Sequence, residues 1–233
     1  MKLTIEPRKT TWVPFVDSAA QVKIEWRARA EYQPHNVRQQ LHHPVKSRYT
    51  FTGLEGALAL PSAQLILMED GVPLTITQSV ASAVKNQFQS EEVDDPFVSI
   101  TDRLASLKKS DQKDRKLAKG LIERTWVETI ERNIQIENRT GKAVKLSFTL
   151  VDHPAESLEF VQAEPAPTRS SPPEYTFELA MEAEANLKLR VTLRHSRSES
   201  IRLPVEAAPQ PGYSAPARQA AQANLDADFA NES

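Results

Sequence analysis

The sequence contains no cysteine and only six glycines. Without cysteine there is no disulfide, no thiolate catalysis and no cysteine-bound zinc or iron–sulfur cluster. Six glycines build neither a phosphate-binding loop nor a dinucleotide fingerprint, and no serine has the flanking glycines of a hydrolase nucleophile. These absences set several enzyme classes aside and leave packing as the source of stability.

Long apolar runs and an excess of one charge are also missing. No stretch approaches the ~18 apolar residues that span a bilayer, and residues 1–7 lack the apolar core of a signal peptide. The 31 acidic residues nearly balance the 29 basic ones, so net charge does not favour nucleic acid or an anionic membrane as a partner. We therefore expect a soluble cytoplasmic protein without a membrane partner.

What the sequence does contain is apolar alternation with a period of two, most clearly in residues 124–150. The even positions of two segments carry the apolar residues Trp126, Ile130, Ile134, Ile136 and then Val144, Leu146, Phe148, Leu150. Successive side chains of a strand point to opposite faces, so both segments are predicted strands. Asn138 to Gly141 has turn-forming residues, which predicts an antiparallel hairpin. Its even face is expected to pack against three residues of an opposing sheet: Tyr175, Phe177 and Leu189.

Further strands are predicted on both sides of this segment. Residues 22–32 alternate most strictly, and Asp70-Gly71 between two apolar runs predicts a second hairpin. Short strands are also expected at 3–5, 49–52, 57–60, 65–68, 74–77, 175–179, 187–195 and 201–203. Residues 33–46 have the composition of a long loop, and the spacing of Val80, Val84 and Phe88 suggests one short helix. The sequence thus predicts an all-β, mainly antiparallel fold of one or two β-sandwich units.

The segment 102–123 is rich in charge and interrupts these strands. Its candidate partner-contact residues are Lys108, Lys109, Lys113, Arg115, Lys116 and Lys119. The segment is interpreted as a solvated hairpin tip or a link, partly helical or mobile. It separates an N-terminal β-rich region, 1–101, from a C-terminal sandwich-like region, 124–206, and residues 207–233 are expected to be a disordered tail. Whether the two regions share one core is left open.

Histidines and paired acids are the remaining candidates for chemistry. His35, His42, His43 and His153 are expected to be exposed loop residues, because adjacent His42 and His43 diverge in any extended segment and no metal site is expected. His195 continues an apolar alternation and is expected to be a partly buried structural residue. The pairs Glu91-Glu92 and Asp94-Asp95 are interpreted as solvated loop acids. The tryptophans give no sugar platform, since Trp26 and Trp126 lie on apolar strand faces and Trp12 lies in an irregular segment.

Several short motifs resemble a known family. They are Leu60-Pro61 with Leu65 to Gly71, then Asp95 to Ile100, then Thr129 to Asn138 leading into Val144 to Pro154. Together they resemble the uncharacterised β-rich domain in the C-terminal part of bacterial mucoidy-inhibitor-like proteins, over residues 49–203. The resemblance implies a mostly β fold and carries over no catalytic residue and no established activity.

These patterns favour a non-enzymatic structural or protein-interaction module that binds a protein partner or itself and needs no cofactor. Its contact surface would be an unpaired sheet edge or the C-terminal tail. One alternative is a hydrolase or carbohydrate-binding protein with a site built from loops. A second alternative is an adaptor that binds nucleic acid or an acidic partner through residues 103–124. A concave apolar cleft with convergent histidines and carboxylates would favour the hydrolase.

Overall fold

The computed structural model describes residues 20–53, 64–69, 72–80, 87–118 and 120–203. The expected strands at 3–5 and 57–60 and the expected disordered tail lie outside these residues. Internal contacts divide the chain into two compact units: residues 1–112 with 125–197, and residues 113–124 with 198–233. Within these residues every regular element is a strand except one 3-10 turn, Pro154–Glu156, which confirms the all-β fold.

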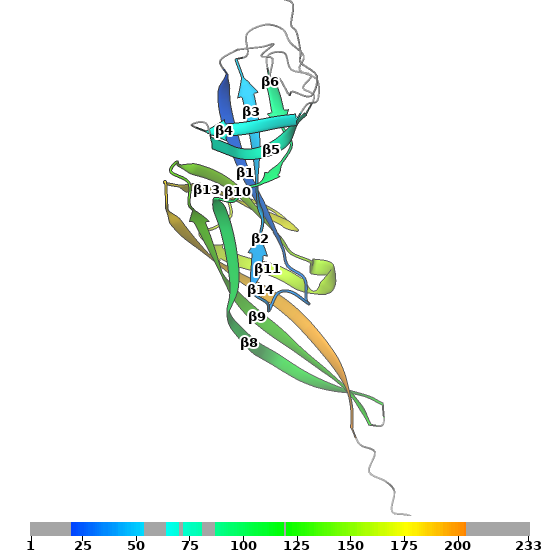
Figure 1. The fold of residues 1–233 in the computed structure, drawn as a ribbon. Helices are drawn as coiled ribbons and strands as arrows, with labels where there is room; N and C mark the ends of the chain where they lie inside the picture. Colours follow the sequence, from blue (N-terminus) through cyan, green and yellow to red (C-terminus); the bar gives the residue numbers. More distant parts are fainter. Residues whose placement is uncertain (1–19, 54–63, 70–71, 81–86, 119, 204–233) are drawn as a thin grey trace, which may run out of the picture. The chain divides into compact units, whose positions relative to one another are not determined.

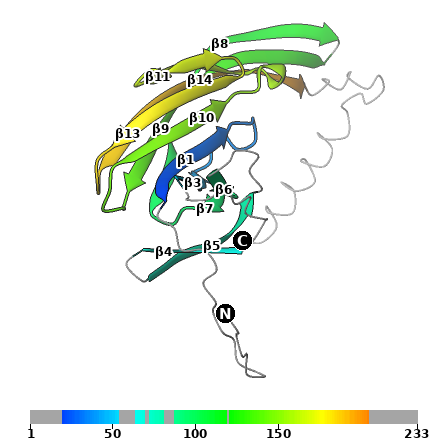
Figure 2. The ribbon, with the colours of Figure 1, turned by 90° about the horizontal axis from the view of Figure 1, so that it is seen from above.

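The strands form two sheets (Figure 1). The larger sheet has the order β12 (Arg169–Ser171), β13 (Glu174–Met181), β10 (Val144–Val151), β1 (Gln21–Glu31), β3 (Val45–Thr52), β6 (Gln87–Ser90), β5 (Val72–Val80), β4 (Gln64–Glu69), with β7 (Val93–Asp94) on β3. The smaller sheet has the order β11 (Leu158–Glu164), β14 (Asn186–Arg202), β9 (Leu121–Asn138), β8 (Val98–Ala118), β2 (Leu41–His43). In Figure 2, β8, β11 and β14 lie in one layer and β1, β3 and β6 in the other.

Pairing between the described strands is mainly antiparallel, as predicted, and one described pair is parallel. β1 pairs with β10 in parallel, with Trp26 opposite Leu146 and Ala30 opposite Leu150. The sequence contains no long helix that would return the chain for parallel pairing, so parallel neighbours were not expected. The intervening strands, which belong to both sheets, return the chain instead.

The prediction that residues 124–150 form a hairpin is wrong, although both predicted strands are present. β9 belongs to the smaller sheet and β10 to the larger one, so residues 139–143 connect two layers and not two paired strands. Asn138 fixes this connection: its Nδ2 donates to the carbonyls of Lys142 (2.9 Å) and Glu182 (2.7 Å), and its Oδ1 accepts from the N–H of Thr140 (2.9 Å). Alternation predicts which face of a strand is buried, but it does not identify the neighbouring strand.

One hydrophobic core joins residues from both predicted halves of the chain. Ala30, Val45 and Ile100 from the first half belong to the same cluster as Ile134 and Phe148 from the second. The inward alternation of β9 and β10 is therefore confirmed. Its expected partners divide between the sheets, because Tyr175 and Phe177 lie beside β10 in the larger sheet whereas Leu189 belongs to the sheet of β9.

Three local predictions need correction. Residues 102–118 and 121–123 are strand, so the charged segment takes the hairpin form and not the helical one. Residues 33–46 are not one loop, because β2 and the start of β3 lie within them. Val80 and Phe88 are strand residues of β5 and β6, so the expected helix does not include them; Val84 lies outside the described residues. In residues 103–118 most side chains are exposed and many are charged, so these residues do not show the apolar alternation by which the other strands were predicted.

The second unit, taken by itself, contains the ends of β8, β9 and β14. Arg124 holds Asp114 with two hydrogen bonds, from Nε (2.8 Å) and Nη2 (2.9 Å) to the two carboxylate oxygens. The N–H of Leu203 donates to the carbonyl of Gly120 at 2.8 Å. The hydrogen bond from Arg124 lowers the pKa of Asp114, so this exposed pair is ionised at neutral pH.

Candidate functional site

The basic residues singled out in the sequence lie along one strand. Lys108, Lys109, Lys113, Arg115 and Lys116 are exposed residues of β8, and Lys119 lies outside the described residues. Neighbouring residues of a strand, such as Lys108 and Lys109, point to opposite faces. The Nζ of Lys109 lies 5.2 Å from the centre of the Trp126 ring. Lys108 and Lys109 therefore lie on opposite faces of the strand, and the contact of these basic residues with a partner stays a prediction.

A buried ion cluster occupies the core where β2, β8 and β9 meet the loop after β1. It consists of Tyr32, His43, Asp102 and Arg132. Asp102 Oδ2 accepts from Tyr32 Oη (2.6 Å) and lies 3.1 Å from His43 Nε2, and Oδ1 accepts from Arg132 Nε (2.8 Å). The other guanidinium nitrogens of Arg132 donate to the carbonyls of Val37 and Gln39. His43 is thus buried on an aspartate, so the expectation of an exposed loop histidine is wrong for it.

A second set of buried charges surrounds Glu128. This residue lies on the same face of β9 as Arg132, with Ile130 between them. Glu128 is fully buried and accepts from Arg38 Nη2 (2.5 Å) and Trp126 Nε1 (2.9 Å). Burial opposes its ionisation, but these two hydrogen bonds together with the charges of Arg38 and Arg197 outweigh burial and lower the pKa of Glu128. His195 is 5% exposed, as expected of a structural histidine, and its Nδ1 lies 3.9 Å from Glu128 Oε2. Burial, followed by the charge of Arg197, lowers the pKa of His195.

The sequence carried a signal for both sets of buried charges. Glu128 and Arg132 stand at even positions of β9, the same parity as the buried residues Ile130 and Ile134. A charged residue in the inward register of a strand must find a partner in the core, because an unpaired buried charge costs several kcal/mol. Here the partners come from the chain itself, which gives these residues a structural role.

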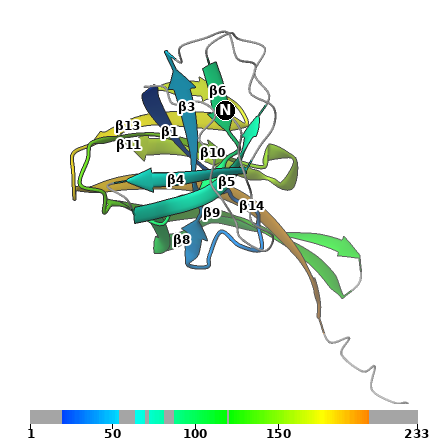
Figure 3. The same cartoon turned by 45° about the horizontal axis from the view of Figure 1, so that its top comes forward.

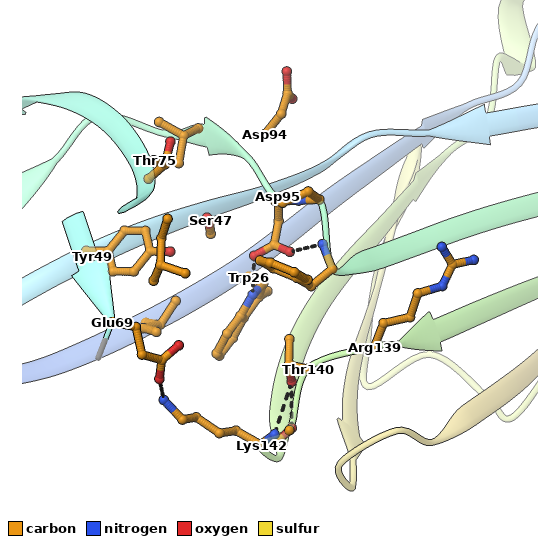
Figure 4. Close-up of a pocket in the computed structure, with 16 residues that line it drawn as sticks. Trp26, Ser47, Tyr49, Glu69, Thr75, Asp94, Asp95, Arg139, Thr140 and Lys142 are labelled. Carbon is orange, nitrogen blue, oxygen red and sulfur yellow. Dashed lines mark hydrogen bonds and ion pairs between the residues drawn. The ribbon is translucent and has the colours of Figure 1, made fainter. Parts of the chain in front are cut away.

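A pocket lies at the end of the core face of β1 and β3 (Figure 4). We call it the Trp26 pocket; its volume is about 190 Å³. The cross-strand pairs Trp26 with Ser47 and Ile24 with Tyr49 follow Ala28 with Val45 of the core along the same face. Hairpin β4–β5, which lies crosswise to β1 and β3 in Figure 3, contributes Leu74. The remaining walls come from residues 93–97 and 139–142.

Fixed polar groups surround the apolar floor of the Trp26 pocket. Asp95 Oδ2 accepts from Trp26 Nε1 at 2.8 Å, and Oδ1 accepts from the backbone N–H groups of Phe97 (2.9 Å) and Val98 (3.0 Å). Two lining residues, Glu69 of the hairpin and Lys142 of the turn, form an ion pair (Figure 4). These bonds hold Trp26 and Asp95 in place before anything enters.

The charged residues at the rim face different partners. Asp94 pairs with Lys46, at 2.6 Å, and Arg139 pairs with Glu137, at 2.6 Å. Burial and the charge of Asp95 raise the pKa of Tyr49, despite a hydrogen bond with Ser47 that lowers it. The Tyr49 phenol is therefore neutral, and the negative charge in the pocket belongs to carboxylates.

The sequence interpretation did not find this pocket. It set Trp26 aside as a binding residue because Trp26 lies on the apolar face of a strand. Trp26 does lie on that face, but the face extends beyond the closed core and lines a pocket. Asp94 and Asp95 were interpreted as solvated loop acids, but Asp95 is half-buried and hydrogen-bonded to the indole. The lining residues come from five separate segments, so no local spacing marks them.

Hairpin β4–β5 also carries an exposed apolar face. We define this face by Ile66, Met68 and Ile76, which are 45% to 59% exposed; Val72 and Val80 of the same hairpin are also exposed. Ile66 and Ile76 are cross-strand partners, and among the described strands β4 is the last one of the larger sheet. Three large apolar side chains on one face of a two-stranded segment differ from the single exposed apolar residues of an ordinary surface.

The remaining titratable candidates do not converge. His35 and His42 are exposed, as expected, and His153 is half-buried with its Nε2 3.1 Å from Glu31. Glu92 pairs with Arg48 at 2.9 Å. Among the described residues no group of three or more histidines and carboxylates is arranged to hold a metal ion, and the Trp26 pocket has no histidine in its lining.

No protein-family model, curated protein or solved structure matches the chain. The resemblance to the mucoidy-inhibitor-like domain therefore stays a prediction. Within the described part of the chain there is no helix with the length and apolarity to cross a membrane.

Proposed function

We propose that the chain is a non-enzymatic protein-binding module that contacts an extended segment of a partner protein. The contact surface would be the exposed apolar face of hairpin β4–β5 together with the outer edge of β4. The observation that supports this proposal is the exposure of Ile66, Met68 and Ile76 on a terminal hairpin of the sheet. Apolar patches of this kind mark interaction sites.

The edge of β4 adds a second way to bind. A terminal strand presents backbone N–H and C=O groups to which another strand can pair. Sheet edges that avoid such pairing usually carry lysine or proline, whereas residues 64–68 of β4 are Gln-Leu-Ile-Leu-Met without a charge. The chain does contain one protective device, a register shift between Leu67 and Met68. Pairing is therefore expected mainly over Gln64 to Leu67.

The hydrolase alternative has less support. A hydrolytic site would combine carboxylates with a histidine or another base in a cleft. The Trp26 pocket contributes carboxylates but no histidine. Its carboxylate with the most hydrogen bonds, Asp95, accepts from an indole and two backbone amides, which is a structural arrangement.

The test is a double substitution, Ile66→Ser with Ile76→Ser, in the full chain. The matched control is Val161→Ser on β11 of the other sheet, which removes an equally exposed apolar side chain, 52% exposed. Partners captured from the native cell are quantified for wild type and both variants, and sedimentation at rising concentration measures self-association.

We expect wild type and the control to bind the same partner and the double variant to lose it. Equal capture by all three proteins would contradict the proposal. Self-association that the double variant abolishes, without any captured partner, would replace the partner protein with a second copy of the chain.

A further inference from the structure

We propose that the Trp26 pocket binds a cationic side chain, the ammonium group of a lysine or the guanidinium group of an arginine. This inference rests on the proposed function in one respect, that the cation belongs to the partner protein. The recognition of a cation by the pocket itself depends only on the residues that line it.

The size of the pocket suits a single side chain. Its volume of about 190 Å³ is below the roughly 300–1,000 Å³ of clefts that enclose whole small molecules. Its floor is apolar, with Ile24, Leu74 and Phe97 among the lining residues. Long basic side chains place their methylene stems on apolar surface and keep the charged end at polar groups.

The charge of the pocket favours a cation. Three carboxylates line it: Glu69, Asp94 and Asp95. Glu69 and Asp94 are paired with lysines, whereas the described hydrogen bonds and ion pairs of Asp95 involve one indole and two backbone amides and no cationic group. The two cations of the lining are Lys142, paired with Glu69, and Arg139, paired with Glu137 outside the pocket. A ligand cation would meet the negative charge of Asp95 in a half-buried site, where solvent screens it less than at the surface.

Two aromatic rings provide the second part of the site. Trp26 and Tyr49 line the pocket from neighbouring strands (Figure 4). The faces of aromatic rings attract cations, and carboxylate and ring together form the kind of cage that recognises alkylammonium groups. The hydrogen bond between Asp95 and the indole keeps ring and carboxylate in a fixed arrangement.

The other tryptophan of the described chain shows that this fold already uses such contacts. The ring of Trp126 has Lys109 Nζ at 5.2 Å and Arg197 Cζ at 5.9 Å from its centre. Among the described residues the cation–ring contacts fall on Trp126 and Tyr32, and none falls on Trp26. No described residue places a cation over the Trp26 ring, and we assign that position to a side chain of the partner.

The experiment is a titration of the full chain, labelled with ¹⁵N, with blocked single residues. The probes are Nα-acetyl-lysine methylamide, its trimethylated form, Nα-acetyl-arginine methylamide, the neutral analogue Nα-acetyl-norleucine methylamide, and glucose. The readout is the indole N–H signal of Trp26, assigned by Trp26→Phe, with the Trp126 signal as internal reference. We expect the three cations to shift the Trp26 signal in the millimolar range, less at high salt, and to leave Trp126 unchanged.

Two substitutions test the carboxylates. Asp95→Asn and, separately, Glu69→Gln are each expected to weaken cation binding by about threefold to tenfold, as loss of a partly desolvated charge contact would. Glu69→Gln also guards against a folding defect of Asp95→Asn, since Glu69 makes no bond to the core. The matched control Glu159→Gln removes an exposed carboxylate whose partner, Arg194, also lies outside the lining, and it should leave the affinity unchanged.

If the norleucine and lysine probes shifted the Trp26 signal equally, the inference would be overturned and the pocket would be purely apolar. If glucose alone shifted the signal, the inference would also be overturned and the pocket would be a sugar site. The result is separable from the proposed function. The Ile66→Ser, Ile76→Ser variant should still bind the cation probes if the pocket is as described. Intact partner capture with no response to any cation would refute this inference alone.

Discussion

The inner face of β9 and the outer face of hairpin β4–β5 both depart from the usual rule that charged residues are exposed and large apolar residues are buried. In β9, Glu128 and Arg132 are charged and fully buried, and each has partners from the same chain. In the hairpin, Ile66 and Ile76 are apolar and exposed. The difference teaches how to interpret such exceptions. Buried charges that are satisfied internally belong to the architecture, whereas exposed apolar groups without cover indicate a contact with another molecule.

The largest expected effect comes from breaking the buried ion cluster. Arg132→Met leaves Asp102 buried without its cation and removes the donors to the carbonyls of Val37 and Gln39. We expect the free energy of unfolding to fall by about 3 to 5 kcal/mol, measured by urea denaturation.

The matched control is Arg194→Met, because Arg194 forms an exposed ion pair with Glu159 at 2.7 Å. An exposed pair is worth about 0 to 1 kcal/mol. A similar loss of stability in both variants would show that the buried cluster is no more important than a surface ion pair.

The next effect compares the same substitution in the two regions. Ile134→Ala opens a cavity in the core and should cost about 2 to 5 kcal/mol, and Phe148→Ala should cost a similar amount. Ile66→Ala on the hairpin should change stability by no more than about 0.5 kcal/mol. Thermal and urea unfolding of the three variants measure the difference. A stability-neutral Ile134→Ala that abolished partner binding would move the functional surface to β9.

The smallest expected effect is on the pH dependence of the free energy of unfolding, to which His195 and Glu128 contribute. The folded-state pKa of His195 is lowered, so the unfolded chain binds the proton more tightly and stability falls as pH drops below the ordinary value of about 6.5. The lowered pKa of Glu128 acts in the same direction at more acidic pH, because its contribution is lost as pH falls through the folded-state pKa.

His195→Leu should therefore flatten the loss of unfolding free energy between about pH 7 and about pH 5. Exposed His42→Leu is the control and should keep the wild-type slope. Unfolding curves are measured across this pH range. If the free energy of unfolding depended on pH equally in both variants, the expectation would be contradicted.

The sequence predicts the strand content and the buried faces better than the arrangement of the strands. The parity of Ile130, Ile134 and Phe148 identified core positions, because a strand has a strict period of two. It did not show that β9 and β10 enter different sheets, since a turn sequence such as Asn138 to Gly141 also suits a change of layer. That choice depends on contacts with Glu182, which is distant in the sequence.

The two candidate surfaces were harder to predict for different reasons. The run Leu65 to Met68 has the composition of a buried strand, yet Ile66 and Met68 are exposed, so composition alone did not reveal this surface. The Trp26 pocket combines residues from five segments, so its chemistry appears only after folding. Glu128 and Arg132, in contrast, could have been recognised from their inward register alone.

The parallel pairing of β1 with β10 also has a consequence for the order in which the protein can fold. Trp26 and Leu146 are neighbours in the sheet although they lie roughly 120 residues apart in the chain. During synthesis β1 emerges early but lacks one of its two neighbouring strands until β10 has left the ribosome. Contacts of such long range slow folding and leave strand edges open in the nascent chain. β1, the earliest described strand in the chain, is thus among the last to gain both of its neighbours.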